Sequence, residues 1–129
     1  MSAAGKKRVL VIDDASLVRA YYRQALERAG YEVDEALNGI EGLEKLLMHS
    51  VDIAIVDINM PRMDGITFLR ALRSKDLPTS ATPALVTSTE AGAQDISAAR
   101  IAGANYYLVK PISQEILAEY VAMLCGADR

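Results

Sequence analysis

The chain alternates between short runs of apolar residues and longer segments in which apolar residues recur at helical spacing. A short, continuous apolar run is typical of a strand covered on both faces, whereas apolar residues three or four positions apart indicate a helix with one buried face. This pattern predicts strands at 9–12, 31–36, 53–56, 84–87 and 106–109. It predicts helices at 16–29, 40–48, 94–102 and 113–124, and a further helix that follows Gly65 and runs through Leu72.

Turn and cap residues mark the ends of several predicted elements. Ser16 is the expected N-cap of the first helix, and Gly30 is its expected stop signal. The segment 60–65 holds a proline and a glycine and is expected to be a loop, and 75–83 is a polar connection with two prolines. The leucines of the second helix are expected to face inward: Leu43, Leu46 and Leu47.

The alternation of strands and helices predicts an α/β fold, a doubly wound five-stranded parallel sheet with helices on both faces. The chain has 129 residues, the size of one ordinary domain, and no linker or repeat divides it. Its composition, 51% hydrophobic and 24% charged, is that of a globular protein. We therefore expect a single domain over residues 1–129, with its core at about 8–124.

The net charge and the cysteine content limit the partners and the cellular compartment that the protein can have. The net charge of −3 argues against the basic surface that nucleic-acid binding requires. The lone Cys125 excludes an internal disulfide and suits a reducing compartment. The apolar run at 9–12 is too short for a signal peptide or a membrane span. We expect a cytoplasmic protein that neither enters a membrane nor binds nucleic acid.

Acidic residues follow two of the predicted strands. Asp13 and Asp14 come directly after the first strand, and Asp57 follows the third. Ligands of such sheets bind at the carboxyl ends of the strands, so neighbouring strands would bring the three carboxylates together. An aspartate after a strand is also a common N-cap. Three on one edge would repel unless a cation lies among them, and all-oxygen ligands suit Mg²⁺.

Other polar residues are expected at the same edge. Thr87 and Ser88 end the fourth strand, and Lys110 follows the fifth. A divalent cation and an ammonium group are what phosphoryl transfer requires, because charge neutralisation and positioning supply most of the catalysis. A carboxylate can act as the nucleophile and form an aspartyl phosphate. The residues at this edge of the sheet therefore predict a Mg²⁺-dependent site for phosphoryl transfer.

The residues around these strand ends form a series with a characteristic order and spacing. Its pieces are Val11-Ile12-Asp13-Asp14, Val56-Asp57-Ile58-Asn59-Met60-Pro61, Met63-Asp64-Gly65, the hydroxyl pair, and Ala102-Gly103-Ala104 leading to Tyr107 and Lys110-Pro111. Over residues 8–124 the chain resembles the receiver domain of bacterial two-component systems, most closely the single-domain chemotaxis-type (CheY-like) regulators. The resemblance implies a flavodoxin-like sheet with strand order 2-1-3-4-5 and a cis peptide bond before Pro111.

The resemblance also implies roles for the acidic edge. Asp57 would accept a phosphoryl group from the phosphohistidine of a histidine kinase or histidine phosphotransfer protein. Asp14, Asp57 and the backbone carbonyl of Asn59 would ligate Mg²⁺, and Asp13 would act through bound water. Lys110 would contact the phosphoryl oxygens. Such a protein is a signalling switch that catalyses its own phosphorylation and dephosphorylation, not an enzyme with a separate substrate.

Ser88 is the expected switch hydroxyl. In the family this residue lies five positions after the proline that opens the fourth strand, here Pro83, and two before a glutamate, here Glu90. Alternation along the strand points Thr87 the opposite way, and Thr87 is the alternative. Tyr107, three residues before Lys110, occupies the position of the family's switch aromatic.

Asn59 and Glu90 resemble the pair that admits water in regulators that lose their phosphoryl group rapidly. The switch is expected to alter the face formed by 94–102, 106–109 and 113–124, where an output partner of unknown identity would bind. The last helix carries a second apolar stripe that is expected to be partly exposed, at Ile116, Tyr120 and Met123. The stripe is either the ordinary margin of the buried helix face or a surface that binds a partner or a second copy of the chain, giving a homodimer.

Two other functions are weighed against the switch. A Mg²⁺-dependent phosphohydrolase commonly has a second aspartate two residues after the nucleophile, but that position is Asn59. A receiver-fold interaction module that takes no phosphate would not need the full set of site residues. The pathway stays open, because the lysines of motor-binding chemotaxis regulators are replaced here by Gly92, Ala93, Tyr120 and Met123.

Overall fold

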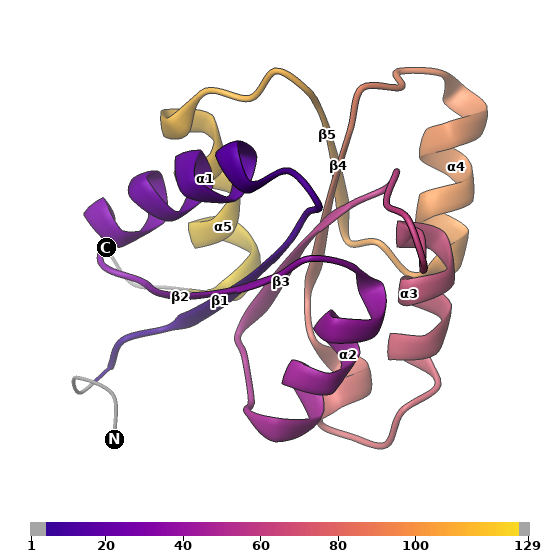
Figure 1. The fold of residues 1–129 in the computed structure, drawn as a ribbon, viewed down its shortest axis with the longest axis horizontal. Coiled ribbons are helices and arrows are strands. Elements are labelled where there is room, and N and C mark those ends of the chain that lie inside the picture. Colours follow the sequence, from indigo (N-terminus) through magenta and orange to yellow (C-terminus); the bar gives the residue numbers. More distant parts are fainter. Residues whose placement is uncertain (1–4, 127–129) are drawn as a thin grey trace.

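A computed structural model describes residues 5–126, in which strands and helices alternate along the chain (Figure 1). The strands are β1 (Arg8–Ile12), β2 (Glu32–Ala36), β3 (Ile53–Asp57), β4 (Ala84–Ser88) and β5 (Tyr106–Val109). The helices are α1 (Ser16–Arg28), α2 (Gly39–Met48), α3 (Gly65–Arg73), α4 (Ala93–Ala102) and α5 (Gln114–Cys125), with a short 3-10 helix η1 (Thr79–Ala81) between α3 and β4.

The strands form one parallel sheet in the order β2-β1-β3-β4-β5. Helices α1 and α5 cover one face, and α2, α3 and α4 cover the other (Figure 1). The predicted doubly wound α/β fold and its strand order 2-1-3-4-5 are therefore confirmed. The register pairs Ile12 with Val56, so the residue after β1, Asp13, lies level with Asp57 at the end of β3.

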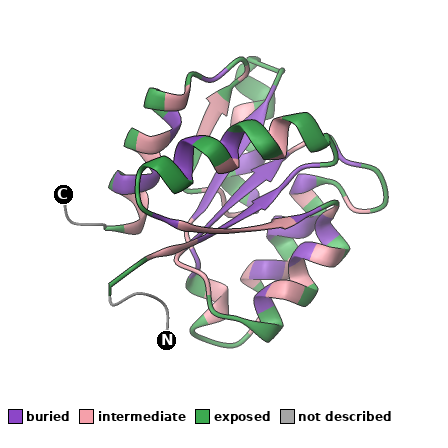
Figure 2. Cartoon of the chain, turned by 60° about the vertical axis from the view of Figure 1, so that its left-hand side comes forward, coloured by how far each residue is buried: buried purple, intermediate pink, exposed green. Residues whose placement is uncertain are grey.

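The three central strands are buried along nearly their whole length (Figure 2). Alternate residues feed two separate core layers, as a sheet covered on both faces requires. Leu10 and Val56 pack with Phe68 in the layer under α2, α3 and α4. Val11 and Leu85 pack in the opposite layer, under α1 and α5. The strands therefore form a rigid base for the loops that follow their carboxyl ends.

Two local predictions are wrong. The N-cap of α1 is Ala15 rather than Ser16, and no side chain caps the helix. Instead, the N–H of Ala15 donates to Asp13 Oδ1 at 2.9 Å, so the turn after β1 is closed by an aspartate upstream of the helix. Leu47 does not face inward, because the residue is 65% exposed. Its neighbour Leu46 is the buried residue, and consecutive helical positions differ in direction by about 100°.

No helix within residues 5–126 combines the length and the apolar character needed to cross a bilayer.

Candidate functional site

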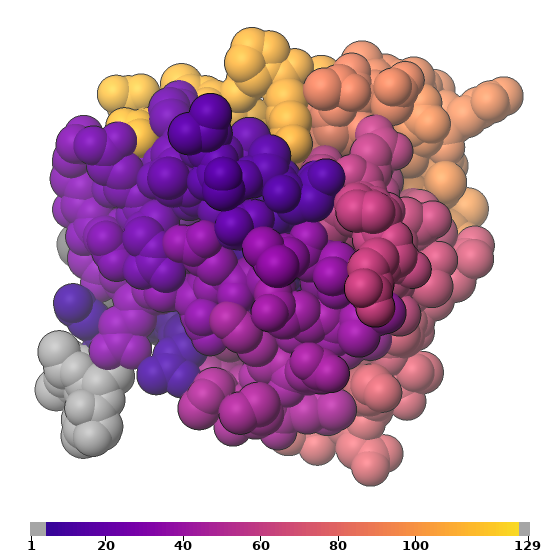
Figure 3. Space-filling model, in the orientation of Figure 1, coloured from indigo at the N-terminus to yellow at the C-terminus, as the bar shows by residue number. Residues whose placement is uncertain are grey.

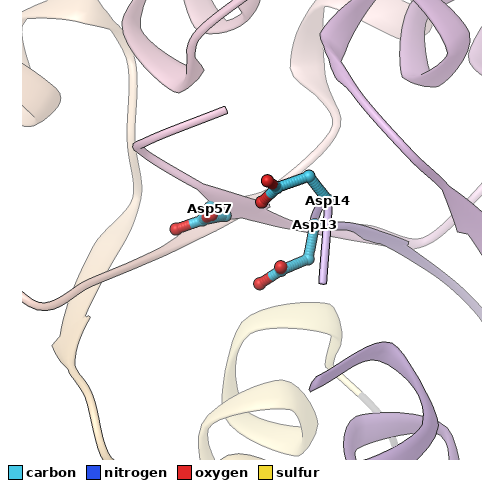
Figure 4. A group of neighbouring side chains, drawn as sticks. All are labelled: Asp13, Asp14 and Asp57. Carbon is cyan, nitrogen blue, oxygen red and sulfur yellow. The ribbon is translucent and has the colours of Figure 1, made fainter. Parts of the chain in front are cut away.

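Three aspartates meet where β1 and β3 end. Carboxylate oxygens of Asp13, Asp14 and Asp57 all lie within 4.8 Å of one another. The side chains of Asp13 and Asp14 turn toward the end of β3, where Asp57 lies (Figure 4). Asp13 and Asp57 are buried and Asp14 is exposed, so the group opens to solvent on one side. Figure 3 shows the loop after β1, in indigo, beside the loop after β3, in magenta and pink.

Lys110, directly after β5, supplies a cation to this group. Its Nζ donates to Asp13 Oδ2 at 3.2 Å and to Asp57 Oδ1 at 3.3 Å. Its own backbone N–H donates to the carbonyl of Ser88 at 2.7 Å, which ties the β5–α5 loop to the end of β4. The peptide bond between Lys110 and Pro111 is cis, as predicted.

The charges of the group do not balance. Burial and the neighbouring charge of Asp13 raise the pKa of Asp57, although Lys110 acts in the opposite direction. Burial alone would lower the pKa of Lys110, but Asp13 and Asp57 outweigh it, so the pKa of the ammonium is raised. Asp13 and Asp57 thus share one ammonium group, and Asp14 adds a third carboxylate beside them. A set of oxygen ligands with surplus negative charge and one open side suits a second, hard cation.

Backbone contacts hold Asp13 in place. Its N–H donates to the carbonyl of Ala36 at 3.1 Å, and its own carbonyl accepts from the Arg19 guanidinium at 2.7 Å. Its side chain accepts from Ala15, as described above. Arg19 was not identified from the sequence, because a lone basic residue on an exposed helical face carries no signal of such a contact.

The segment after Asp57 turns sharply beneath it. A Cβ at Gly65 would lie 2.8 Å from both the carbonyl oxygen of Asp57 and the Cα of Ile58, so only glycine permits this close approach. The N–H of Gly65 donates to Ile58 at 2.9 Å. Asp64 then caps α3 by accepting from the N–H of Thr67 at 2.8 Å. The glycine and the aspartate of this motif therefore shape the backbone that carries Asp57.

Residues of β4 alternate between the two core layers, with Val86 in one and Leu85 in the other, so Ser88 and Thr87 are expected on opposite faces of the sheet. Ser88 is buried, and its Oγ accepts from the N–H of Glu90 at 3.0 Å. The carbonyl of Glu90 accepts from the Tyr107 hydroxyl at 2.8 Å. Ser88 and Tyr107 are therefore linked through the peptide groups of one residue. The side chains of Glu90 and Asn59 lie exposed in the loops after β4 and β3.

Comparison with known proteins agrees with this geometry. The sequence profile of the response regulator receiver domain matches residues 9–122, and the chain belongs to this family. The chain is 36% identical to the chemotaxis protein CheY1 of Helicobacter pylori, over 94% of its own length and 98% of that protein.

Solved structures agree as well. The crystal structure of chemotaxis protein CheY4 of Vibrio cholerae superposes with a TM-score of 0.86 at 33% identity, covering 92% of this chain and 98% of CheY4. The receiver domain of sensor histidine kinase PA1611 from Pseudomonas aeruginosa, which has a magnesium ion in its active-site cleft, gives a TM-score of 0.86. It covers 94% of this chain and 98% of that domain, and at 22% identity the likeness concerns the fold alone.

The chain is thus a CheY-like receiver domain of a two-component response regulator. Receiver domains act as phosphorylation-dependent switches, and they interact with histidine kinases and output proteins.

Proposed function

We propose that Asp57 accepts a phosphoryl group from the phosphohistidine of a histidine kinase or a histidine phosphotransfer protein. The observation that carries this proposal is the meeting of Asp13, Asp14, Asp57 and Lys110 at one edge of the sheet. One carboxylate oxygen of Asp57 attacks the phosphorus atom, and the bond from phosphorus to the imidazole nitrogen breaks. Positioning and charge neutralisation supply most of the catalysis in such a transfer.

Mg²⁺ fits the donor set of this edge. Asp14, Asp57 and the backbone carbonyl of Asn59 would hold the ion directly, and Asp13 would hold it through water. The surplus negative charge and the exposed side of the group support this assignment. When bound, the ion neutralises charge on the carboxylates and on the transferred phosphoryl oxygens. The ammonium of Lys110 neutralises a further oxygen, and it leaves Asp13 to do so.

The switch would run through Ser88, Glu90 and Tyr107. Ser88 Oγ now accepts from the N–H of Glu90, and movement of Ser88 to donate its own hydroxyl hydrogen to a phosphoryl oxygen would draw the Oγ away from that N–H. The loop would then be free to move, and with it the carbonyl that holds the Tyr107 hydroxyl. A contact that exists in only one state is what biases a two-state equilibrium. The face formed by α4, β5 and α5 would change as a result.

Loss of the phosphoryl group requires a water molecule in line with the phosphorus–oxygen bond. Asn59 and Glu90 lie exposed at the ends of β3 and β4, which supports a role in admitting that water. We expect spontaneous loss of the phosphoryl group. The decay rate of the labelled protein should change when either residue is replaced by a bulky or apolar one. A decay indifferent to both replacements would remove them from the mechanism.

The output surface is proposed on α5 and β5. Tyr106 and Tyr120 stack with their ring centroids 4.6 Å apart, and Ile116 and Met123 are large exposed apolar residues beside them. A partner protein or a second copy would bind here mainly through apolar contacts, so salt should weaken binding little. Tyr120→Glu should abolish that binding and leave Asp57 labelling intact. Undiminished partner binding by this variant would move the output surface elsewhere.

Incubation with acetyl phosphate and Mg²⁺ tests the function itself. A switch gives a slowly decaying adduct on Asp57, a phosphohydrolase gives rapid multiple turnover, and a passive module gives no adduct. Asp57→Asn keeps the shape of the residue and removes the nucleophile, so labelling should vanish while the far-ultraviolet circular dichroism spectrum is unchanged. Labelling of Asp57→Asn to the extent of wild type would disprove the assignment.

A further inference from the structure

Two buried residues that carry hydroxyl groups lie beneath the site. Tyr22 on α1 is 3% exposed, and Thr87 on β4 is fully buried. Among residues 5–126, Thr87 Oγ1 makes no hydrogen bond of normal geometry, although it lies near enough to the Tyr22 hydroxyl to interact with it. Burying a hydroxyl without a partner is unfavourable, whereas a valine of the same shape would avoid that cost. An orphan of this kind in a native core calls for an explanation.

The surroundings of Tyr22 connect it to the site. Tyr22 and Lys110 line one pocket of about 420 Å³, together with Val18, Tyr21, Thr89, Pro111 and Ile112. Burial raises the pKa of Tyr22, and the charges of Asp13 and Asp57 act in the same direction, whereas Lys110 and a side-chain interaction with Thr87 act in the opposite direction. The Tyr22 hydroxyl is thus a polar group on an otherwise largely apolar side of α1, where Ala25 and Leu26 are buried.

We propose that Tyr22 is a positioning residue for Lys110 in the phosphorylation reaction, with Thr87 as the partner of its hydroxyl. This inference rests on the function proposed above. An ammonium group has three N–H donors, and Asp13 and Asp57 now take two of them. When Lys110 leaves Asp13 for a phosphoryl oxygen, the phenol oxygen of Tyr22 accepts a bond from it and keeps the ammonium at the site.

Thr87 completes this arrangement. The Tyr22 hydroxyl hydrogen donates to Thr87 Oγ1 in the phosphorylated state, which turns the present interaction of these two side chains into a full hydrogen bond. A neutral phenol suits this task better than a carboxylate would, because the edge already carries surplus negative charge. The pair therefore favours the state in which Lys110 points toward the phosphoryl group.

Two variants remove one group each. Tyr22→Phe should slow Asp57 labelling by acetyl phosphate on the order of tenfold, the value of one hydrogen bond to a charged group, at fixed Mg²⁺. Its melting temperature and its Mg²⁺ affinity should equal those of wild type. Thr87→Val should slow labelling in the same direction, although it removes an unpaired buried hydroxyl and should melt no lower than wild type. A control is Tyr31→Phe, since Tyr31 is a buried tyrosine of the same core layer before the amino end of β2.

The Lys110→Met variant distinguishes an effect of Tyr22 on the position of Lys110 from an effect of Tyr22 on core packing. If Tyr22 acts through Lys110, adding Tyr22→Phe to Lys110→Met changes the residual labelling rate less than twofold, whereas a packing effect would persist in full. Wild-type labelling by Tyr22→Phe, or an undiminished tenfold loss in the Lys110→Met background, overturns the inference while the proposed function stands. If the wild-type protein itself takes no label, the proposed function fails, and this inference fails with it.

Discussion

Two groups of acidic side chains differ in how their charge is balanced. The site cluster is Asp13, Asp14 and Asp57; the edge cluster is Glu32, Asp34 and Glu35, on strand β2. Each member of the edge cluster has its own cation. Arg8 pairs with Glu32 at 3.2 Å, Lys45 with Asp34 at 3.0 Å, and both Arg19 and Arg23 pair with Glu35, at 2.8 and 2.6 Å. In the site cluster Lys110 serves both buried carboxylates.

The pKa values follow this difference. The hydrogen bond from Arg23 lowers the pKa of Glu35 despite partial burial. In Asp34, burial would raise the pKa, but the bonds from Lys45 and from the backbone outweigh it and the pKa is lowered. In Asp57, burial and Asp13 prevail over Lys110 and the pKa is raised. Acidic residues with matched cations place charged side chains along the edge strand, which discourages pairing with another chain. Acidic residues with too few cations leave surplus negative charge that can bind a further cation.

The largest expected difference is in metal binding. Asp14→Asn removes a charged ligand and should weaken Mg²⁺ binding on the order of 100-fold, whereas Asp34→Asn on the edge cluster should leave it unchanged. Isothermal titration calorimetry with MgCl₂ measures both. An unchanged affinity in Asp14→Asn would count against direct ligation by this residue.

Removal of the cation should affect the two clusters unequally. Lys110→Met leaves two buried carboxylates without their partner and should lower the free energy of unfolding by about 2 kcal/mol in metal-free buffer. Lys45→Met breaks a partly exposed pair and should cost less than about 0.5 kcal/mol. Urea denaturation of both variants at pH 7 measures the difference. Equal losses would show that the two clusters do not differ in balance.

Neutralising one acid should change stability with opposite signs. Without metal, Asp57→Asn should raise the free energy of unfolding at pH 7 by about 1 kcal/mol, because it relieves repulsion. Glu35→Gln should lower it by about 1 kcal/mol or less, because it removes an acceptor shared by Arg19 and Arg23. Thermal melts in the presence of a chelator compare the two. A lower melting temperature of Asp57→Asn would contradict the inference that the site cluster carries surplus negative charge.

The same contrast should appear in the dependence on pH. The raised pKa of Asp57 means that protonated Asp57 stabilises the fold, a contribution present below the ordinary aspartate pKa and lost as pH rises through the raised value. The free energy of unfolding of Asp57→Asn should therefore exceed that of wild type by an increasing amount as pH rises from about 4.

For Glu35, whose pKa is lowered, the contribution is present above the ordinary glutamate pKa and lost as pH falls through the lowered value. The difference in free energy of unfolding between wild type and Glu35→Gln should therefore disappear as pH falls below about 4. Urea titrations between pH 3 and pH 7, on the order of one pH unit apart, test both signs. Parallel profiles for the two variants would contradict the comparison.

Much of the site could be predicted because its residues follow strands directly in the sequence. A buried parallel strand is a continuous apolar run, and the polar residue that ends it, such as Asp13 or Asp57, must lie at the carboxyl edge. The order of the strands came from the family resemblance, since alternation alone leaves several orders open. The choice of Ser88 over Thr87 rested on spacing and on the two-residue period of a strand, both of which are local properties.

Contacts between segments far apart in sequence could not be predicted. The Arg73 guanidinium donates to the carbonyls of Ser80, Thr82 and Gly103 and to the side chain of Asn105, which joins α3 to the turn after α4. Nothing near Arg73 in the sequence marks it as different from an exposed helical arginine. The prediction that Leu47 faces inward was wrong for a related reason. An apolar residue on a helix is buried only if another element covers that part of the helix.

The sequence by itself determined the class of fold and the residues that stand at its carboxyl edge, since both depend on periodicity and on residues adjacent along the chain. Only the tertiary structure decided which of those residues touch, that Lys110 serves Asp13 and Asp57 together, and that Tyr22 and Thr87 lie buried beneath them. Side-chain packing across the sheet settles such contacts, and packing depends on the shapes of all the neighbours at once.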